Sequence, residues 1–417
     1  HDTVRRQRQM CIRDSYNGPA LTAANHLNIS VIRMSVRQQH LAGEFELLGE
    51  VHNSVTSEQL PSQNDIALIL HTSGTTSRPK IVPLLHSNIV SSAENIRESL
   101  SLSEQDICMN IMPLFHIHGL IAAVTASIGA GGSVWCTPGF DALKFFRWLD
   151  DVSPSWFTAV PTMHQAILAR SERNKNIIDR NKLRFLRSSS ASLPSQVMKE
   201  LERVFSAPII EGYGMTEATH QMASNPLAPS KQKPGSVGLE AGPKIRIAHE
   251  LENHLIDGTG EVVISGPNIT PGYENNVDAN KNSFFEFEGK RWFRTGDQGA
   301  FDADGYLTLT GRLKEIINRG GEKISPLEVD EVLMDHPGIV QVVTFAVPHE
   351  KLGEDVAAAV VLEENSGLTE TDLRAFAAER MVDFKVPKKI VILSEIPKGA
   401  TGKLQRIGLA EKLGLIK

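Results

Sequence analysis

A loop rich in hydroxyl groups and glycine follows an apolar run near the start of the chain. It reads HTSGTTSRPK over residues 71–80, directly after ALIL at 67–70. Hydroxyl groups donate hydrogen bonds to phosphate oxygens, glycine lets the backbone approach an anion, and a lysine adds positive charge. The loop therefore predicts a polyphosphate site, with an ordinary turn as the alternative. Its candidate binding residues are Thr72, Ser73, Gly74, Thr75, Thr76 and Lys80. The GxxxxGK[ST] spacing of a Walker A loop is missing, which disfavours a generic P-loop NTPase.

Three later segments carry polar side chains directly after apolar runs. They read IMPLFHIHG at 111–119, RSSSASL at 187–193 and EGYGMTEATH at 211–220. In open α/β sheets, ligands collect beyond the carboxyl ends of the strands. These segments are therefore expected to surround one cleft together with the hydroxyl-rich loop.

The elements that must position these residues alternate between strands and helices. The expected strands are 66–70, 107–112, 155–160, 183–187 and 208–210, and the expected helices include 163–172 and 194–205. This alternation predicts an α/β fold with a large, mostly parallel sheet. The strand at 66–70 is expected to be buried and parallel. A helix capped by Ser87 is expected to follow the loop, because Ile89, Ala93, Ile96 and Leu100 recur at helical spacing.

The pattern changes after Pro234 to short β segments and turns. A β-rich subdomain is expected from strands at 260–265, 289–293 and 305–310. Beyond it, Ser325 and Glu328 form an S-x-x-E capping box with Pro326 at the first helical position, which predicts a helix start. Strands at 340–347, 356–362 and 389–393 and a helix at 369–380 predict a small α+β unit, with its boundary near residues 312–314. The glycine-containing loop PKGATGKLQR at 397–406 carries Lys403.

Composition excludes several classes of protein. The 417 residues favour two domains, and the net charge of -6 disfavours a nucleic-acid partner. The apolar region 119–135 is too short and interrupted to span a membrane. The 3 cysteines show no metal-binding spacing and suit a reducing compartment. Because the sequence ends in GLIK and lacks a peroxisomal signal, a cytoplasmic location is expected.

Taken together, these motifs resemble the adenylate-forming superfamily of acyl-CoA synthetases and luciferase-like enzymes. HTSGTTSRPK, GYGMTEATH, FRTGD, GRLKEIINRGGEKISPLEVD and PKGATGKLQR occur in the family order. The resemblance implies an AMP-binding N-terminal domain over residues 16–312 and a small, mobile C-terminal domain over residues 313–417. The N-terminal domain is expected to be partial, because most of the region that normally precedes the phosphate loop is missing. Residues 1–15 are expected to be a disordered or non-native leader.

The resemblance also implies a two-step reaction with ATP and CoA as cosubstrates and Mg2+ as cofactor. Lys403 corresponds to the catalytic lysine, Glu217 to the Mg2+-binding glutamate and Asp297 to the ribose-binding aspartate, with Arg312 as its partner. The remaining nucleotide-binding positions are Gly212, Tyr213, Gly214, Met215 and Thr216. Lys314 corresponds to the hinge, and Gly320 and Gly321 to the passage for the pantetheine arm of CoA. The structural alternatives are surface charges, ion pairs, a core tyrosine and a hairpin turn.

The acyl substrate is expected to be a small polar carboxylic acid. The candidate acyl-site residues are His116, His118, Ser189, Ser190 and His220. Their polar side chains suit an acid with a second charge. A fatty acid would instead gain about 0.8 kcal/mol per methylene buried in an apolar tunnel. The motifs are most similar to those of the oxalate-activating branch of the superfamily. A medium-chain or aromatic acid, a carrier-loading adenylation domain and an inactive nucleotide-binding paralogue or fragment are the alternatives. The sequence leaves the oligomeric state open.

Overall fold

The computed structural model describes residues 19–29, 31, 33–35, 44–48, 60–72, 79–398 and 404–416. The chain divides into two compact units, one comprising residues 1–62 with 136–139 and the other comprising the remainder. In the described part of the first unit, helix α2 spans Pro19–His26, and strands β1 (Arg33–Ser35) and β2 (Glu46–Leu48) pair antiparallel. The predicted leader at residues 1–15 lies outside the described residues and stays a prediction.

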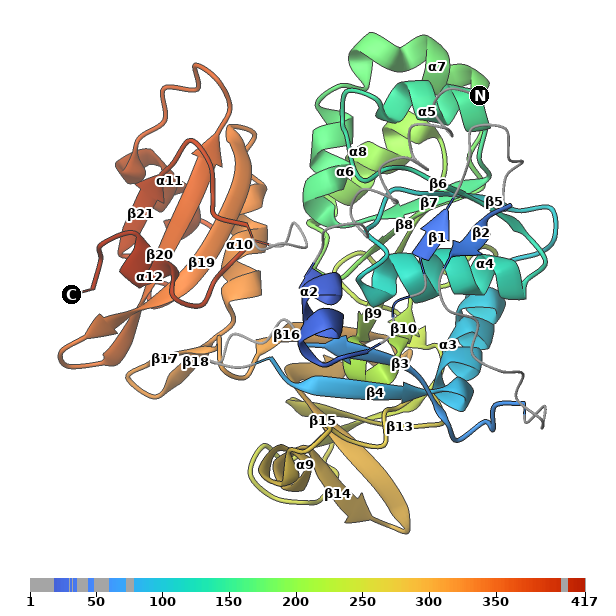
Figure 1. Ribbon diagram of the computed structural model, residues 1–417. Helices are drawn as coiled ribbons and strands as arrows, with labels where there is room; N and C mark the ends of the chain where they lie inside the picture. Colours follow the sequence, from blue (N-terminus) through green and yellow to red (C-terminus); the bar gives the residue numbers. More distant parts are fainter. Residues whose placement is uncertain are drawn as a thin grey trace. The chain divides into compact units, whose positions relative to one another are not determined.

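A seven-stranded sheet forms the centre of the second unit (Figure 1). Its order is β11-β10-β9-β8-β7-β5-β6. The strands are β5 (Ile107–Asn110), β6 (Ser133–Cys136), β7 (Trp156–Ala159), β8 (Phe185–Ser189), β9 (Ile209–Met215), β10 (His220–Ser224) and β11 (Leu239–Glu240). Strands β5, β7, β8 and β9 are parallel, and β10 returns antiparallel to β9. The predicted parallel α/β sheet is therefore confirmed.

Two layers of helices cover the faces of this sheet, because alternate residues of each strand point to opposite sides. On β8, Leu186 packs with helices α5, α6, α7 and α8, whereas Phe185 packs with α3, η1 and α4. The helices of the first face are α5 (Phe145–Val152), α6 (Pro161–Leu168), α7 (Lys175–Arg180) and α8 (Ser195–Phe205), with the short turn η2 (Glu172–Asn174) before α7. Those of the second face are α3 (His86–Ser99), η1 (His118–Thr125) and α4 (Ala126–Gly129).

The strand before the hydroxyl-rich loop differs from its prediction. Strand β3 (Ile66–His71) is not parallel; it pairs antiparallel with β4 (Ile81–Leu85), a strand that the sequence did not predict. Nor is β3 fully buried, since Ile66 and Ile69 are 51% and 54% exposed. The chain returns because Thr72 donates its N–H to the Lys80 carbonyl oxygen across the loop.

The cap of helix α3 also differs from its prediction. The N-cap residue is Leu85, and its N–H donates to the Asn88 side chain at 2.8 Å, so Ser87 does not cap the helix.

The β-rich part of the second unit is a five-stranded sheet. Its order is β12-β13-β15-β14, and β16 also pairs with β15. The elements are β12 (Lys244–Ala248), β13 (Gly260–Ser265), helix α9 (Val277–Ser283), β14 (Phe284–Phe287), β15 (Lys290–Phe301) and β16 (Leu307–Arg312). Strand β15 runs through the FRTGD motif, and its Asp297 lies opposite Arg312 at the end of β16.

The predicted α+β unit follows β16. Strands β17 (Ile317–Arg319), β18 (Glu322–Ile324), β19 (Ile339–His349), β20 (Gly353–Leu362) and β21 (Lys389–Ile392) form its sheet, with helices α10 (Pro326–Met334), α11 (Glu370–Ala378) and α12 (Leu409–Lys412). Helix α10 begins as predicted, with the Ser325 hydroxyl accepting the Glu328 N–H at 3.1 Å. The Glu328 carboxylate contacts Lys385 at 2.6 Å, so the predicted capping box forms only through the Ser325 hydroxyl.

Across the described ranges, no helix is both long enough and apolar enough to cross a membrane. The predicted boundary near residues 312–314 stays a prediction.

Candidate active site

The carboxyl end of β9 carries the first group of predicted site residues. After Met215 the chain forms the short helix η3 (Thr216–Ala218) and turns back into β10. Gly214 lies against the backbone at the start of β10, since a Cβ atom there would sit 1.8 Å from the His220 carbonyl oxygen. Only glycine permits so close an approach. The Tyr213 side chain contacts Asp297 on β15, and the Glu217 side chain contacts Tyr273 in the segment between β13 and α9.

Tyr213, Asp297 and Arg312 form one contact group, in which Tyr213 and Asp297 are buried and the Arg312 side chain is 54% exposed. The Tyr213 hydroxyl donates to Asp297 Oδ2 at 2.5 Å, and Arg312 Nε lies 3.3 Å from Asp297 Oδ1. Burial and the Asp297 charge raise the pKa of Tyr213, so the phenol stays protonated and acts as a donor. The Asp297 charge also raises the pKa of Arg312. One hydrogen bond and one ion pair therefore orient the carboxylate.

Glu217, Tyr273 and Lys80 form a second group. The Tyr273 hydroxyl donates to Glu217 Oε1 at 2.7 Å, and Lys80 Nζ lies 4.3 Å from the centroid of the Tyr273 ring. Burial lowers the pKa of Lys80, the Glu217 charge raises it, and the Lys314 charge lowers it. The charges of the Glu217 carboxylate and of the Lys314 ammonium group therefore both act on Lys80.

These two groups belong to one site. The charge of Glu217 acts on Arg312 of the first group, and the charge of Arg312 acts on Tyr273 of the second. The structure therefore places Lys80, Glu217 and Asp297 near one another, and their predicted roles stay predictions. A cationic group beside an oriented carboxylate can bind the phosphate and sugar parts of a nucleotide.

The described residues include only the two ends of the hydroxyl-rich loop. Lys80 donates its N–H to Thr72 Oγ1 at 3.2 Å, which holds these ends together. The other predicted residues of the loop, and the predicted catalytic lysine, lie outside the described residues and stay predictions: Ser73, Gly74, Thr75, Thr76 and Lys403.

The predicted acyl-site residues meet around His118 on η1. One ring nitrogen, Nδ1, lies 3.1 Å from the Ser190 hydroxyl, and the other, Nε2, lies 2.6 Å from the Thr158 hydroxyl. The centroid of the His220 ring is 5.4 Å from that of His118. His118 and His220 are almost fully buried. The structure therefore joins three of the predicted residues in a compact polar cluster.

The backbone at this cluster adopts unusual angles. Ser190 has φ +77° and His220 has φ +106°, in the left-handed region that non-glycine residues rarely occupy. Such angles persist where the surrounding structure enforces them, and they concentrate at ligand sites. The other two predicted residues lie at the margin: His116 accepts the His118 N–H at 3.2 Å, and Ser189 donates to the Gly212 carbonyl oxygen at 2.6 Å.

Gly320 and Gly321 form the two-residue turn between β17 and β18, where Arg319 pairs with Glu322. Their φ values are +61° and +98°. A two-residue hairpin turn of type I′ requires positive φ at both central positions, which alone explains both glycines. The predicted CoA passage and the predicted hinge at Lys314 stay predictions.

Sequence reasoning missed three residues of the site. Tyr273 contacts Glu217, Thr158 contacts His118, and Arg187 lies opposite Thr158 in the pairing of β7 with β8. Tyr273 follows Pro271 and Gly272, a turn signal that could have directed attention to it. Arg187 could have been noticed as a charged residue inside an apolar strand.

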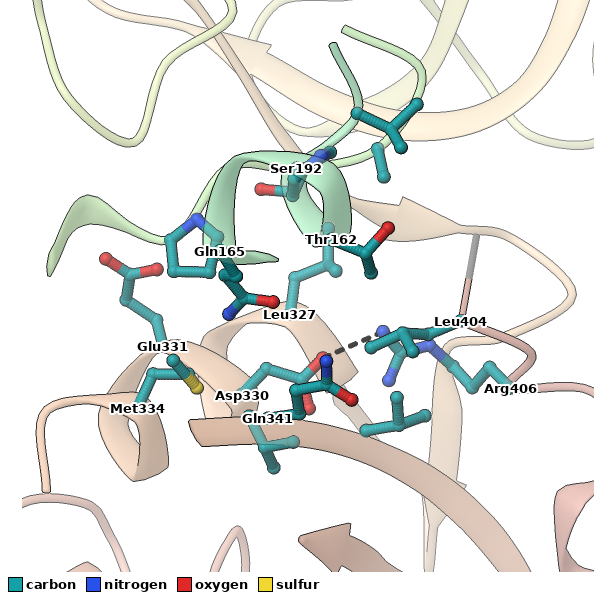
Figure 2. A pocket seen from close by; sticks show the side chains of 16 residues that line it. Thr162, Gln165, Ser192, Leu327, Asp330, Glu331, Met334, Gln341, Leu404 and Arg406 are labelled. Atoms are coloured by element: carbon teal, nitrogen blue, oxygen red, sulfur yellow. Dashed lines mark hydrogen bonds and ion pairs between the residues drawn. The ribbon is translucent and has the colours of Figure 1, made fainter. Parts of the chain in front are cut away.

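A separate pocket of about 140 Å³ lies beside α6 and α10 (Figure 2). Its wall includes Asp330, and Arg406 Nη2 contacts Asp330 at 2.8 Å. Arg406 also donates to the Thr344 carbonyl oxygen and lies 3.3 Å from Glu315. None of the lining residues is a predicted site residue. These contacts fix the side chain of Arg406, which is close to Lys403 in the sequence.

Comparisons with known proteins show the family of the chain. Residues 18–274 match the AMP-binding enzyme family, and residues 328–403 match the AMP-binding enzyme C-terminal domain. The chain is 47% identical over 399 residues to an oxalate–CoA ligase of Arabidopsis thaliana, covering 94% of this chain and 76% of the relative. It is 45% identical to an oxalate–CoA ligase of Saccharomyces cerevisiae, covering 86% of this chain and 65% of that protein.

The structure is also similar to ATP-bound MatB from Rhodopseudomonas palustris. The TM-score is 0.78 at 29% sequence identity, and the similarity covers 84% of this chain and 69% of MatB.

Proposed function

The chain belongs to the AMP-binding enzyme family, and on this premise we propose that it is an ATP-dependent acid–CoA ligase whose acid is oxalate. The observation that carries the proposal is the adjacency of the two groups of residues. Glu217 of the nucleotide group lies within η3, and His220 of the polar cluster follows this turn as the first residue of β10. A phosphate held beside Glu217 would thus lie close to an acid held beside His220.

The first step joins the acid to AMP. A carboxylate oxygen attacks the α-phosphate of ATP, the bond to pyrophosphate breaks, and an acyl-adenylate forms. Both reactants are anions, so the site must supply positive charge and orientation. Lys80 would bind the phosphates, Asp297 would accept hydrogen bonds from ribose hydroxyls, and Lys403 would bridge the carboxylate and the α-phosphate.

Mg2+ suits the carboxylate present at this site. Mg2+ commonly uses one or two protein carboxylates and completes its coordination with phosphates and water. Glu217 is buried beside Lys80 and oriented by Tyr273, so it can supply one such oxygen. When bound, the ion would neutralise phosphate charge.

In the second step the CoA thiol attacks the acyl carbonyl and AMP departs. We assign residues 16–312 to the AMP-binding domain and residues 313–417 to a C-terminal domain that turns about Lys314. This rotation would exchange the Lys403 loop for the turn at Gly320 and Gly321. The cytoplasmic location inferred from the sequence stays a prediction.

The polar cluster supports oxalate as the acid. His118 and His220 are buried, and Ser190 and Thr158 hydroxyls hold the His118 ring. Imidazole and hydroxyl groups of this cluster could donate hydrogen bonds to a second carboxylate, whereas an apolar chain offers them no acceptor. The structural similarity to MatB shows the fold and does not identify the acid, so the proposal of oxalate depends on this cluster.

An assay over a panel of acids tests the proposal. Pyrophosphate release and thioester formation would be measured with oxalate, malonate, glycolate, hexanoate and benzoate, and oxalate should give the highest kcat/KM. Faster turnover of hexanoate or benzoate would reassign the substrate and leave the enzyme class intact. ATP binding without turnover of any acid would instead favour an inactive paralogue or fragment.

A further inference from the structure

Arg187 occupies an unusual place in the large sheet. It lies inside β8, it has no solvent exposure, and it points to the same face as Phe185 by strand alternation. On the neighbouring strand β7, Thr158 is its direct partner in the register. The side chain therefore belongs to the layer that contains α3 and η1.

The hydrogen bonds of its guanidinium group are incomplete. Nη2 donates to Gln221 Oε1 at 3.2 Å. Among the described residues, Nε and Nη1 have no hydrogen-bond partner, and no carboxylate forms an ion pair with Arg187. Burial lowers its pKa to about 10, so the group still carries a positive charge at neutral pH.

Other shielded arginines of this chain are paired. Arg294 contacts Glu261, Arg319 lies 2.7 Å from Asp355, and Arg406 lies 2.8 Å from Asp330. A buried charge without a counter-ion is strongly unfavourable, and a packed apolar residue would avoid that cost. The exception at Arg187 therefore calls for a role other than stability.

Arg187 lies directly beneath the polar cluster. Its register partner Thr158 contacts His118 Nε2 at 2.6 Å, and its hydrogen-bond partner Gln221 follows His220 in β10. A Cβ atom on Gly212 would lie 2.7 Å from Arg187 Nη2, so the guanidinium fills the space next to that glycine. The positive charge and the bulk of this side chain thus occupy the layer below the two histidines.

We propose that Arg187 is a specificity-determining positioning residue, which favours short dianionic acids at the His118–His220 cluster and occupies the volume that a longer acyl chain would need. The inference rests on the proposed function and deepens it. In this role Arg187 acts through Thr158 and His118 and through its electric field. Fields of buried charges act strongly because the surroundings screen them weakly.

The test compares Arg187→Met, which removes the charge at similar length, with Arg187→Lys, which keeps it. Arg203→Met on the surface of α8 is the matched control. For each protein, kcat and KM would be measured with oxalate, glycolate and hexanoate, together with the KM for ATP and the thermal unfolding midpoint.

In Arg187→Met, the kcat/KM ratio of oxalate to glycolate should fall at least tenfold, mainly through the KM for oxalate. The KM for ATP should be unchanged, and hexanoate turnover should stay low, because methionine fills a similar volume. Arg187→Lys should keep the ratio within about threefold of wild type, as should Arg203→Met. An unchanged ratio in a folded Arg187→Met would overturn the inference.

If Arg187→Met does not fold, the oxalate preference of Arg187→Lys tests the inference. Retention of the oxalate preference in folded Arg187→Lys supports the role of charge, and its loss contradicts that role. Failure of the wild-type chain to use oxalate contradicts the proposed function, and this inference falls with it. Normal oxalate turnover with an unchanged ratio in Arg187→Met contradicts this inference alone.

Discussion

Tyr213 donates a 2.5 Å hydrogen bond to Asp297 and thereby links the end of β9 to the middle of β15. The bond joins the seven-stranded sheet to the five-stranded sheet. Arg312 approaches the other oxygen of the same carboxylate. The orientation of Asp297 is therefore set before a nucleotide arrives, which reduces the ordering that binding requires.

Replacement of Asp297 should weaken ATP binding. Asp297→Asn removes the negative charge that accepts ribose hydroxyls and that faces Arg312. Since hydrogen bonds to charged groups contribute about 1.5–3 kcal/mol, the KM for ATP should rise roughly ten- to a hundredfold. Steady-state kinetics with varied ATP would measure the change.

Asp302→Asn is the matched control for this change. Asp302 follows the same strand and pairs with Lys233 at the surface, so its substitution should leave the KM for ATP unaltered. Equal KM values for wild type and Asp297→Asn would remove Asp297 from the nucleotide site.

His220→Ala should impair the use of oxalate more than that of ATP. The substitution removes a ring 5.4 Å from that of His118, and it leaves Glu217 and Lys80 in place. The KM for oxalate should rise about tenfold or more, as expected for the loss of one buried polar contact, whereas the KM for ATP should stay within twofold.

His249→Ala provides the comparison, because His249 stacks on His254 outside the cluster. Both kinetic constants of this variant should match wild type. Oxalate kinetics in His220→Ala that equal those of His249→Ala would place His220 outside the acyl site.

Arg406 should control the first half-reaction through the loop that carries Lys403. Its guanidinium contacts Asp330, Glu315 and the Thr344 carbonyl oxygen, and all three contacts lie in the α+β unit. Arg406→Met would release the base of the loop and leave Asp330 buried without its partner. The free energy of unfolding should fall by about 3–5 kcal/mol. Adenylation should slow, whereas thioester formation from supplied oxalyl-AMP should be largely retained.

Lys403→Ala should show the same division between half-reactions without the loss of stability. Lys398→Ala is the control, because Lys398 pairs with Glu395 at the surface. If Arg406→Met or Lys403→Ala slowed both half-reactions equally, the assignment of this loop to adenylation would be wrong.

The sequence predicted those parts of the structure that local pattern determines. The parallel strands β5, β7, β8 and β9 and the start of α10 follow from apolar periodicity and from the capping residues. Strand β4 was missed because Pro83 lies in the middle of its short apolar run, and proline argues against a central strand. Its pairing with β3 requires an edge position that the local pattern does not reveal.

The candidate site was predictable only where a motif marked it. Glu217, Asp297 and His118 lie in recognisable segments, and their roles in a site stay predictions. Tyr273 and Thr158 reach the site through the register of distant strands, which no short segment encodes. Arg187 was missed for a related reason: its burial and its lack of a carboxylate partner exist only in the folded chain.

Glu211 should make stability depend on pH. It is buried beneath the 190–193 segment, where it accepts the Leu193 N–H at 3.0 Å. Burial raises its pKa from 4.5 to about 8, and the charge of Glu331 adds to the rise. The folded chain therefore binds a proton that the unfolded chain has released between about pH 4.5 and pH 8. The resulting stabilisation is complete below about pH 4.5 and is lost as the pH rises to about 8.

Over that range the contribution of Glu211 should decrease by an amount on the order of 3–5 kcal/mol. Glu211→Gln, which resembles the protonated acid, should remove this component. Its unfolding midpoint should change less than that of wild type between pH 5.5 and pH 8.5, in contrast to the surface control Glu200→Gln. Thermal melts followed by tryptophan fluorescence would detect the difference. Parallel profiles for wild type and Glu211→Gln would show that Glu211 is ionised in the folded protein over this pH range. An ionised Glu211 would add nothing to the fall of the unfolding midpoint with pH.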